Sequence, residues 1–150
     1  QVLVSPQVKL SVKFGHVLLQ ADVLLNSALE NADDALQIPD IFANGQLSYA
    51  NIFFNGNLDM QVGIDAHWQS DYYALDYDVP TQQFYTQRNF LSPAYPLVDV
   101  FFNARINRSR LFVKYNNLVQ MITKEGYFPT PRYPGVSPVL DFGIEWFFFD

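Results

Sequence analysis

Apolar and polar residues alternate along much of the chain, most clearly at its C-terminal end. The apolar positions there are Leu140, Phe142, Ile144, Trp146 and Phe148, and Asp141, Gly143 and Glu145 lie between them. Successive side chains on a β-strand point to opposite faces, so one face of this segment is apolar. A tilted strand of about ten residues crosses a bilayer, and aromatic residues are common where it leaves the lipid. Residues 140–150 are therefore typical of the closing strand of an outer-membrane β-barrel.

The same alternation predicts seven strands, over residues 2–14, 17–29, 41–54, 58–72, 97–106, 109–118 and 140–150. The fourth is the clearest, since Met60, Val62 and Ile64 alternate with polar residues on both sides. Its length exceeds the usual strand of about five or six residues in globular proteins. We expect an all-β fold, an antiparallel transmembrane β-barrel of the outer-membrane type.

Short and long connections also alternate. Short turns at residues 15–16, 55–56 and 107–108 are separated by long connections at 30–40, 74–96 and 119–137. Outer-membrane barrels have short periplasmic turns, longer extracellular loops and an even number of strands in bacterial single-chain examples. Because seven is odd, we expect residues 1–150 to be the C-terminal part of one larger barrel domain, with N-terminal strands missing and the C-terminus periplasmic.

Composition narrows the class of protein further. No apolar run approaches the roughly 18 residues of a membrane helix, and aromatic residues make up 17% of the chain. A net charge of −6 argues against nucleic-acid binding, which needs a basic surface. The chain has no cysteine, which excludes disulfides and thiolate metal sites. A soluble β-sandwich would also alternate, but strand length and connection length argue against it.

Charged residues and one histidine occupy the faces opposite the apolar ones, and they are the candidate lining of a pore. They are Lys9, Lys13, Asp22, Asp59, Asp65, His67, Asp71, Asp99, Arg105, Arg110, Lys114, Asp141 and Glu145. A charged wall selects solutes by sign, whereas paired charges could instead fill a plugged lumen. Lys or Arg on the lipid face costs about 2–4 kcal/mol at mid-membrane, so confinement to one face supports this facing.

Other chemistry finds little support. Asp65 and His67 share a strand face and could form the pair of an outer-membrane hydrolase, but a Gly-x-Ser-x-Gly motif is absent, so no catalytic residue is expected. Acidic residues at 33–34 and 76–78 could supply oxygen ligands for Ca²⁺, but EF-hand spacing is lacking. We expect no metal and no cofactor. The tyrosines near the long connections are expected to anchor the barrel at the interface; they are Tyr72, Tyr73, Tyr77, Tyr85, Tyr95 and Tyr127.

Several segments resemble the family of putative porins of Bacteroidetes outer membranes. They include Val62-Gly63-Ile64-Asp65, Tyr95-Pro96-Leu97-Val98-Asp99, Ala104-Arg105-Ile106-Asn107-Arg108 and Phe142-Gly143-Ile144-Glu145-Trp146. The resemblance is good over residues 38–150 and looser before them. Family members are longer chains, which agrees with the expected missing strands.

The resemblance implies a porin-like barrel through which small solutes diffuse passively. Its surroundings would be outer-membrane lipid, which the face with Leu140, Phe142, Ile144, Trp146 and Phe148 would contact. The last strand would also be the signal that the barrel-assembly machinery reads. The alternative is a non-conducting barrel that acts as a structural or accessory subunit, with other outer-membrane proteins as partners.

Overall fold

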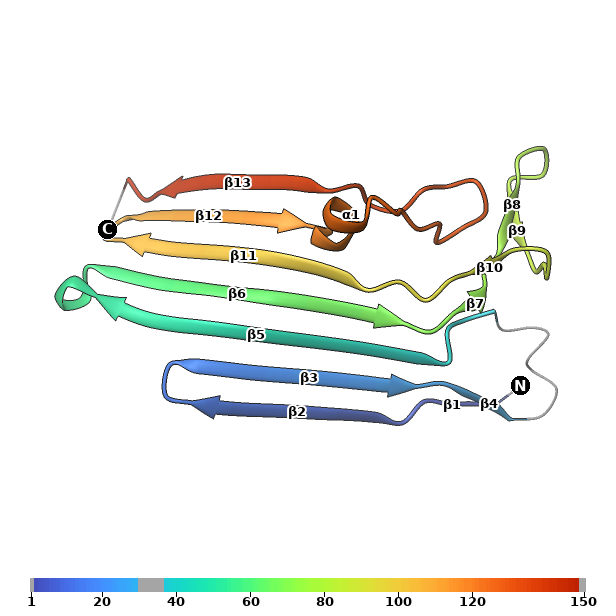
Figure 1. Cartoon of the computed structure of the whole chain (residues 1–150), viewed down its shortest axis with the longest axis horizontal. Helices are drawn as coiled ribbons and strands as arrows, with labels where there is room; N and C mark the ends of the chain where they lie inside the picture. Colours follow the sequence, from blue (N-terminus) through green and yellow to red (C-terminus); the bar gives the residue numbers. More distant parts are fainter. Residues whose placement is uncertain (1, 30–36, 149–150) are drawn as a thin grey trace.

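One antiparallel sheet dominates the computed structural model of the chain, which describes residues 2–29 and 37–148. Each strand lies beside the next one along the chain, in the order β13-β12-β11-β6-β5-β3-β2 (Figure 1). The strands are β2 (Gln7–Phe14), β3 (Val17–Leu25), β5 (Ile41–Phe53), β6 (Leu58–Gln69), β11 (Leu97–Ile106), β12 (Ser109–Asn116) and β13 (Val139–Trp146). The predicted all-β, antiparallel fold of β-barrel type is confirmed, although the sheet is open, with β2 and β13 at its edges.

Short and long connections lie at opposite ends of this sheet (Figure 1). Two-residue turns join β2 to β3 and β11 to β12, and the 3-10 turn η2 (Phe54–Gly56) joins β5 to β6. Gly15 and Asn107 open the two-residue turns with φ of +56° and +52°. Gly and Asn tolerate this left-handed backbone best, which explains why these tight turns form where they do.

The first two predicted strands are each interrupted. Residues 2–14 form β1 (Val2–Val4) and β2, and residues 17–29 form β3 and β4 (Ser27–Leu29). The pairing register continues across the gap, since Val4 lies opposite Ser27. Pro6 causes the break, because it accepts a hydrogen bond from Leu25 N–H (3.0 Å) but has no N–H to return one.

Two predicted strands end earlier than expected because their partners end. Strand β6 stops at Gln69, since Ser70 N–H donates to the carbonyl of Ile41 and β5 begins there. Asp71 therefore lies beyond the strand and is not on its polar face, contrary to the prediction. In the same way β13 stops at Trp146, opposite the first residue of β12, so Phe148 is not part of the strand. Residues 149–150 lie outside the described part of the chain.

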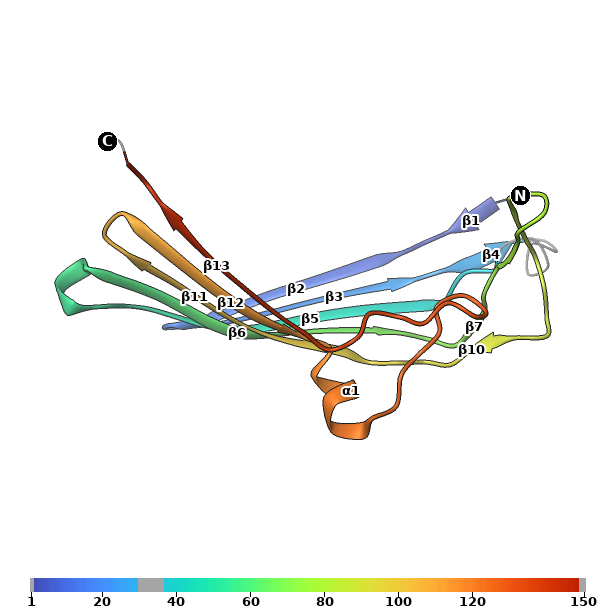
Figure 2. The same ribbon diagram turned by 90° about the horizontal axis from the view of Figure 1, so that it is seen from above.

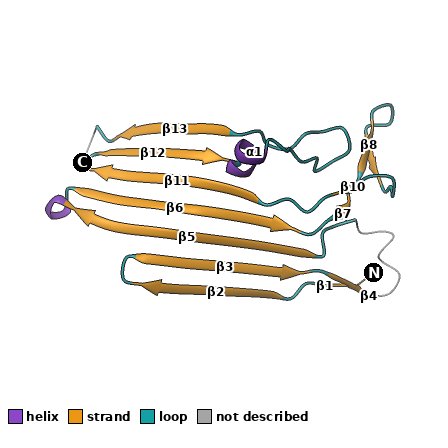
Figure 3. Cartoon of the chain, viewed as in Figure 1, coloured by secondary structure: helices purple, strands orange, loops and turns teal. Residues whose placement is uncertain are grey.

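Small elements lie beyond the seven strands, at the end of the sheet with the long connections (Figure 3). Three two-stranded ribbons pair β1 with β4, β7 (Tyr72–Tyr73) with β10 (Leu91–Ser92), and β8 (Asp76–Asp78) with β9 (Gln83–Tyr85). A short helix, α1 (Leu118–Thr123), was not predicted. It shortens the sixth strand, because Asn117 leaves the sheet in a left-handed conformation and its side chain caps the helix at Gln120 N–H. Neither α1 nor any other helix of the described chain is long and apolar enough to cross a membrane.

The strand register sorts the side chains of the sheet onto two faces. What we define as the apolar face contains no Asp, Glu, Lys or Arg in any of the seven strands; it includes Val12, Leu19, Leu47, Val62, Phe102, Val113 and Phe142. The opposite, polar face contains all the charged residues of these strands. Alternation with period two thus survives across the whole sheet, because every cross-strand pair joins residues of the same face.

The sheet has no hydrophobic core. Ala74, Phe101 and Ala104 are the buried hydrophobic residues of the described chain, and Ala74 is not in the sheet. By contrast, Phe142 is 75% exposed and Ile144 is 72% exposed. No second sheet packs on either face of the seven strands within residues 2–29 and 37–148, so the β-sandwich alternative is not supported.

Two phenylalanines on the polar face cover glycines of the neighbouring strands. Phe101 lies opposite Gly63, and Phe112 lies opposite Gly143. A Cβ added at Gly63 would lie 2.5 Å from Phe101 Cζ and 2.7 Å from the carbonyl oxygen of Leu47. The ring therefore occupies the space that a side chain would fill, as in other sheets in which an aromatic residue shields a cross-strand glycine.

Replacing Gly63 by alanine should destabilise the folded protein. Because the added Cβ meets both a ring and a backbone oxygen, Gly63→Ala should lower the free energy of unfolding by about 1–3 kcal/mol. Gly45→Ala is the matched control, since its Cβ would meet only Gln20 O at 4.0 Å, and the expected change is within about 0.5 kcal/mol. Urea unfolding of the full-length protein in detergent measures both; equal effects would show that the Phe101 contact has no such role.

Candidate pore-lining face

The polar face brings together the residues that the sequence predicted for a pore wall, apart from Asp71. One row across the sheet contains Lys9, Asp22, Asn44 and His67, each opposite the next. The remaining predicted residues on this face are Lys13, Asp59, Asp65, Asp99, Arg105, Arg110, Lys114, Asp141 and Glu145. The face is shared, whereas its exposure to a lumen stays a prediction.

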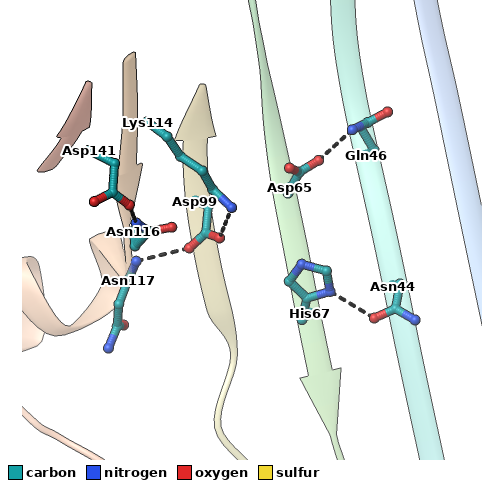
Figure 4. Close-up of polar contacts among 9 residues, drawn as sticks. All are labelled: Asn44, Gln46, Asp65, His67, Asp99, Lys114, Asn116, Asn117 and Asp141. Carbon is teal, nitrogen blue, oxygen red and sulfur yellow. Dashed lines mark hydrogen bonds and ion pairs between the residues drawn. The ribbon is translucent and has the colours of Figure 1, made fainter. Parts of the chain in front are cut away.

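The polar face lies on the concave side of the sheet. An observer who faces along the β6 arrow has β13 on the left-hand side in Figure 1 but on the right-hand side in Figure 4, where Asp141 marks β13. The two figures therefore show opposite faces of the sheet, and the polar side chains of Figure 4 lie on the far side of Figure 1. In Figure 2, which looks down on Figure 1, the outer ends of β1 and β13 rise toward that side and α1 projects to the other. A sheet that curves in this way turns its polar side chains inward.

Three ion pairs cross between strands on this face, two made by arginines and one, described below, by Lys114 and Asp99. Arg105 Nη2 lies 3.1 Å from Asp59 Oδ2, and Arg110 Nη1 lies 3.6 Å from Glu145 Oε2. Both pairs are about half exposed, so each contributes little to stability. Arg105 and Arg110 are directly opposite each other at the short-turn end, and their side chains reach in opposite directions, to Asp59 on β6 and to Glu145 on β13. This end of the face therefore presents two arginines together with two carboxylates.

Asp99 connects the polar face to the third long connection (Figure 4). Its Oδ2 lies 2.9 Å from Lys114 Nζ, and its Oδ1 accepts the backbone N–H of Asn117 at 2.9 Å. The Asp99 side chain is 13% exposed and Asn117 is 1% exposed. Asn117 also donates through Nδ2 to the carbonyl of Val136 at 2.7 Å. The carboxylate thus holds the start of α1 and the chain that returns to β13.

Asp65 and His67, which were considered as a hydrolytic pair and set aside, do not bond to each other. Each side chain bonds across the strands instead, since His67 Nδ1 lies 2.8 Å from Asn44 Oδ1 and Asp65 Oδ1 accepts from Gln46 Nε2 at 2.7 Å (Figure 4). A hydrolytic pair would need the carboxylate on the imidazole. Among residues 2–29 and 37–148, no group of three or more His, Asp or Glu side chains could hold a metal ion. Asp33 and Asp34 lie outside the described residues.

Three open grooves follow the polar face. The largest, about 630 Å³, lies between Arg105 and Arg110 and their acidic partners. A second of about 520 Å³ is lined by Lys9, Asp22 and His67, and a third of about 360 Å³ by Asp65, Lys114 and Asp141 among others. Charges of both signs line each groove, so water and small polar solutes can bind along the face.

Sequence reasoning missed the uncharged part of this face. Asn44 and Gln46 of β5 lie on it, and the alternation in that strand is a sufficient signal for both, while Gln61 and Asn103 were expected on this face but not as pore-lining residues. Two of the tyrosines that were expected to anchor the barrel in the interface, Tyr95 and Tyr127, contact each other instead. Tyr95 stacks on Tyr127, with ring centroids 4.6 Å apart, and both line a cavity over the polar face. These contacts favour a position above the polar face, rather than anchoring in lipid, and no local sequence signal pairs two residues in separate connections.

Asp99 should matter more for stability than the exposed carboxylates. Asp99→Ala leaves the Lys114 ammonium and the Asn117 N–H without their acceptor, which should cost about 1–3 kcal/mol of unfolding free energy. Asp59→Ala, which removes an exposed partner of Arg105, should cost about 1 kcal/mol or less. Denaturant unfolding of the two full-length variants separates these values, and a larger loss for Asp59→Ala would contradict the role given to Asp99.

Of the comparisons with known proteins, the one with protein families found a match. No curated protein and no solved structure matches the chain. The family described as "Putative porin" matches residues 1–150. Membership of a porin family implies an outer-membrane location and suggests a protein without enzymatic activity. The resemblance seen in the sequence is thus confirmed, and the chain belongs to this porin family over its whole length.

Proposed function

We propose that the chain forms part of the wall of an outer-membrane channel for passive diffusion of small solutes. The observation that carries this proposal is the division of one long, coreless sheet into an uncharged apolar face and a grooved, charged face. Lipid is the natural environment for the first and water for the second. Strands β5, β6 and β11, of 13, 12 and 10 residues, are long enough to span a bilayer.

Exposure of the apolar face supports contact with lipid. Leu140, Phe142, Ile144 and Trp146 share one face of β13, and each is more than half exposed. Leaving a large apolar side chain in water rather than burying it costs about 1.5–3 kcal/mol, so a row of such residues is unfavourable in solution. Hydrocarbon removes this cost, and Trp146 and Phe148 suit the membrane–water interface.

The two open edges of the sheet support closure into a barrel. Backbone groups along β2 and β13 that face away from the sheet have no strand partner within the described chain. Each such group costs several kcal/mol in lipid. We therefore propose that strands outside these 150 residues pair with both edges and complete one barrel domain. The short turns and the C-terminus would face the periplasm, and β13 would present its apolar face to the barrel-assembly machinery.

A second candidate is a non-conducting barrel that serves as an accessory subunit of an outer-membrane complex. Two observations favour it: charges on the polar face are paired, as between Lys114 and Asp99, and residues near Tyr127 and Pro129 fold over the same face. Paired charges and a folded-in connection would both narrow a lumen.

Conductance separates the two candidates. The full-length protein, purified in folded form and added to a planar bilayer, should produce discrete and repeatable current steps. Folded protein that inserts without any current steps would contradict the channel and favour the accessory subunit.

Ion selectivity of a variant tests whether the polar face lines the conducting path. Because Arg105 and Arg110 lie side by side on the polar face, Arg105→Gln combined with Arg110→Gln should raise the cation-to-anion permeability ratio by about twofold or more. Lys124→Gln is the control, because Lys124 lies outside the sheet. Unchanged selectivity in the double variant would show that these residues do not face the conducting path.

A further inference from the structure

A cavity of about 200 Å³ lies where the third long connection crosses the polar face. Its lining differs from that of the larger grooves, because none of its residues is Asp, Glu, Lys or Arg. The lining combines aromatic rings with uncharged polar groups, among them Phe42, Tyr72, Tyr95, Tyr127, Asn44 and His67. This combination of residues favours an uncharged ligand.

The aromatic rings of the cavity are held in place. Tyr95 and Tyr127 stack with an interplanar angle of 15°. Burial raises the pKa of the Tyr95 hydroxyl, which lies 3.2 Å from both Asn117 Oδ1 and the Glu125 carbonyl oxygen. Tyr72 donates to the carbonyl of Pro129 at 2.9 Å. Although the rings come from different connections, these bonds pre-organise them, and pre-organisation lowers the entropic cost of binding.

Gly135 makes room for the Tyr127 ring. A Cβ at position 135 would lie 2.3 Å from Tyr127 Cζ, and Gly135 N–H donates to the Tyr127 carbonyl at 2.8 Å. The connection therefore packs closely against the Tyr127 ring at Gly135. Tyr127 is thus held both by its stack with Tyr95 and by its contact with Gly135.

The polar groups of the cavity have hydrogen-bonding capacity to spare. His67 and Asn44 bond to each other through Nδ1 and Oδ1, and both residues are exposed. His67 Nε2, Asn44 Nδ2 and the Gln69 amide make no hydrogen bond to any residue that the structure describes. These side-chain groups can therefore donate hydrogen bonds to, and accept them from, a ligand that packs on the aromatic rings of the cavity.

We propose that this cavity binds one ring of a neutral saccharide. A sugar ring has an apolar C–H face that packs on an aromatic ring and hydroxyl groups that both donate and accept, which matches these two sets of residues. The volume is below the roughly 300–1,000 Å³ of sites for drug-sized ligands and suits a single ring. The proposal deepens the channel function and rests on it, since a site here would hold sugars at the long-connection end of the lumen.

Isothermal titration calorimetry of the folded full-length protein in detergent tests the site directly. The probes are glucose, maltose and maltotriose, with sorbitol as the open-chain comparison. The cyclic sugars should bind with Kd of about 1–10 mM, and sorbitol at least about tenfold more weakly. Absence of binding by all three sugars at 100 mM, which is about ten times the weakest expected Kd, would overturn the proposal.

Variants distinguish this cavity from other sites. Tyr127→Ala should weaken sugar binding about tenfold through loss of the ring surface, whereas Tyr127→Phe keeps the ring and should bind like the unmodified protein. His67→Ala, on an exposed strand position that should tolerate the change, should weaken binding about fivefold by removing a hydrogen-bonding group. Unchanged affinity in both alanine variants would overturn the assignment.

The sugar site and the channel function can be contradicted separately. Because the titration needs no current, a protein that binds sugars but does not conduct would contradict the channel and leave this site supported. A protein that conducts but binds none of the sugars would contradict the site alone.

Discussion

Alternation of side chains across each strand is the constraint on which the rest of this structure depends. A register shift of one residue would turn every side chain of a strand to the other face. For β11 it would expose Asp99, Asn103 and Arg105 to the apolar side, and a single Arg in mid-membrane costs about 2–4 kcal/mol. The register is therefore set by the whole row of residues rather than by any one pair, and a sheet without a core can still be specific.

The two ends of the sheet differ because their connections differ. At one end, tight turns rely on left-handed backbone at Gly15 and Asn107, and two arginines lie side by side. At the other, the long connections are tied together, since Ser92 Oγ donates to the carbonyl of Phe128 and Gln37 Nε2 to that of Gln87. A charged groove thus occupies one end of the polar face, and an uncharged aromatic cavity the other.

Strand interiors and facing could be predicted from the sequence because both follow from period two. β11 was predicted at its observed bounds, and the confinement of charge to one face was visible in residues such as Asp59, Asp65 and Asp99. The ends of β6 and β13 could not be predicted, since these strands stop where a partner strand stops. The effect of Pro6 on two strands at once needed the pairing as well.

Contacts between separate connections were also out of reach. Tyr95 and Tyr127 stack only because β11, β12 and α1 bring distant segments together. The sequence around Asn117 likewise gives no sign of its bonds to Asp99 and Val136. Phe101 and Phe112 break the alternation on the polar face, and their positions make sense only across the strand from Gly63 and Gly143. The local sequence pattern is enough to predict the sheet, while the candidate sugar site depends on tertiary contacts.

The central claim is that one face meets water and the other lipid, and cysteine accessibility tests it most directly. These 150 residues contain no cysteine, so single substitutions can be made at two neighbouring pairs, Gln61 with Asn103 and Val62 with Phe102. Each full-length variant in intact membranes is treated with a small, charged, membrane-impermeant thiol reagent. The account predicts reaction at positions 61 and 103 and protection at 62 and 102, with all four reacting after unfolding. Reaction at 62 and 102 in the native membrane, or protection at 61 and 103, would contradict it.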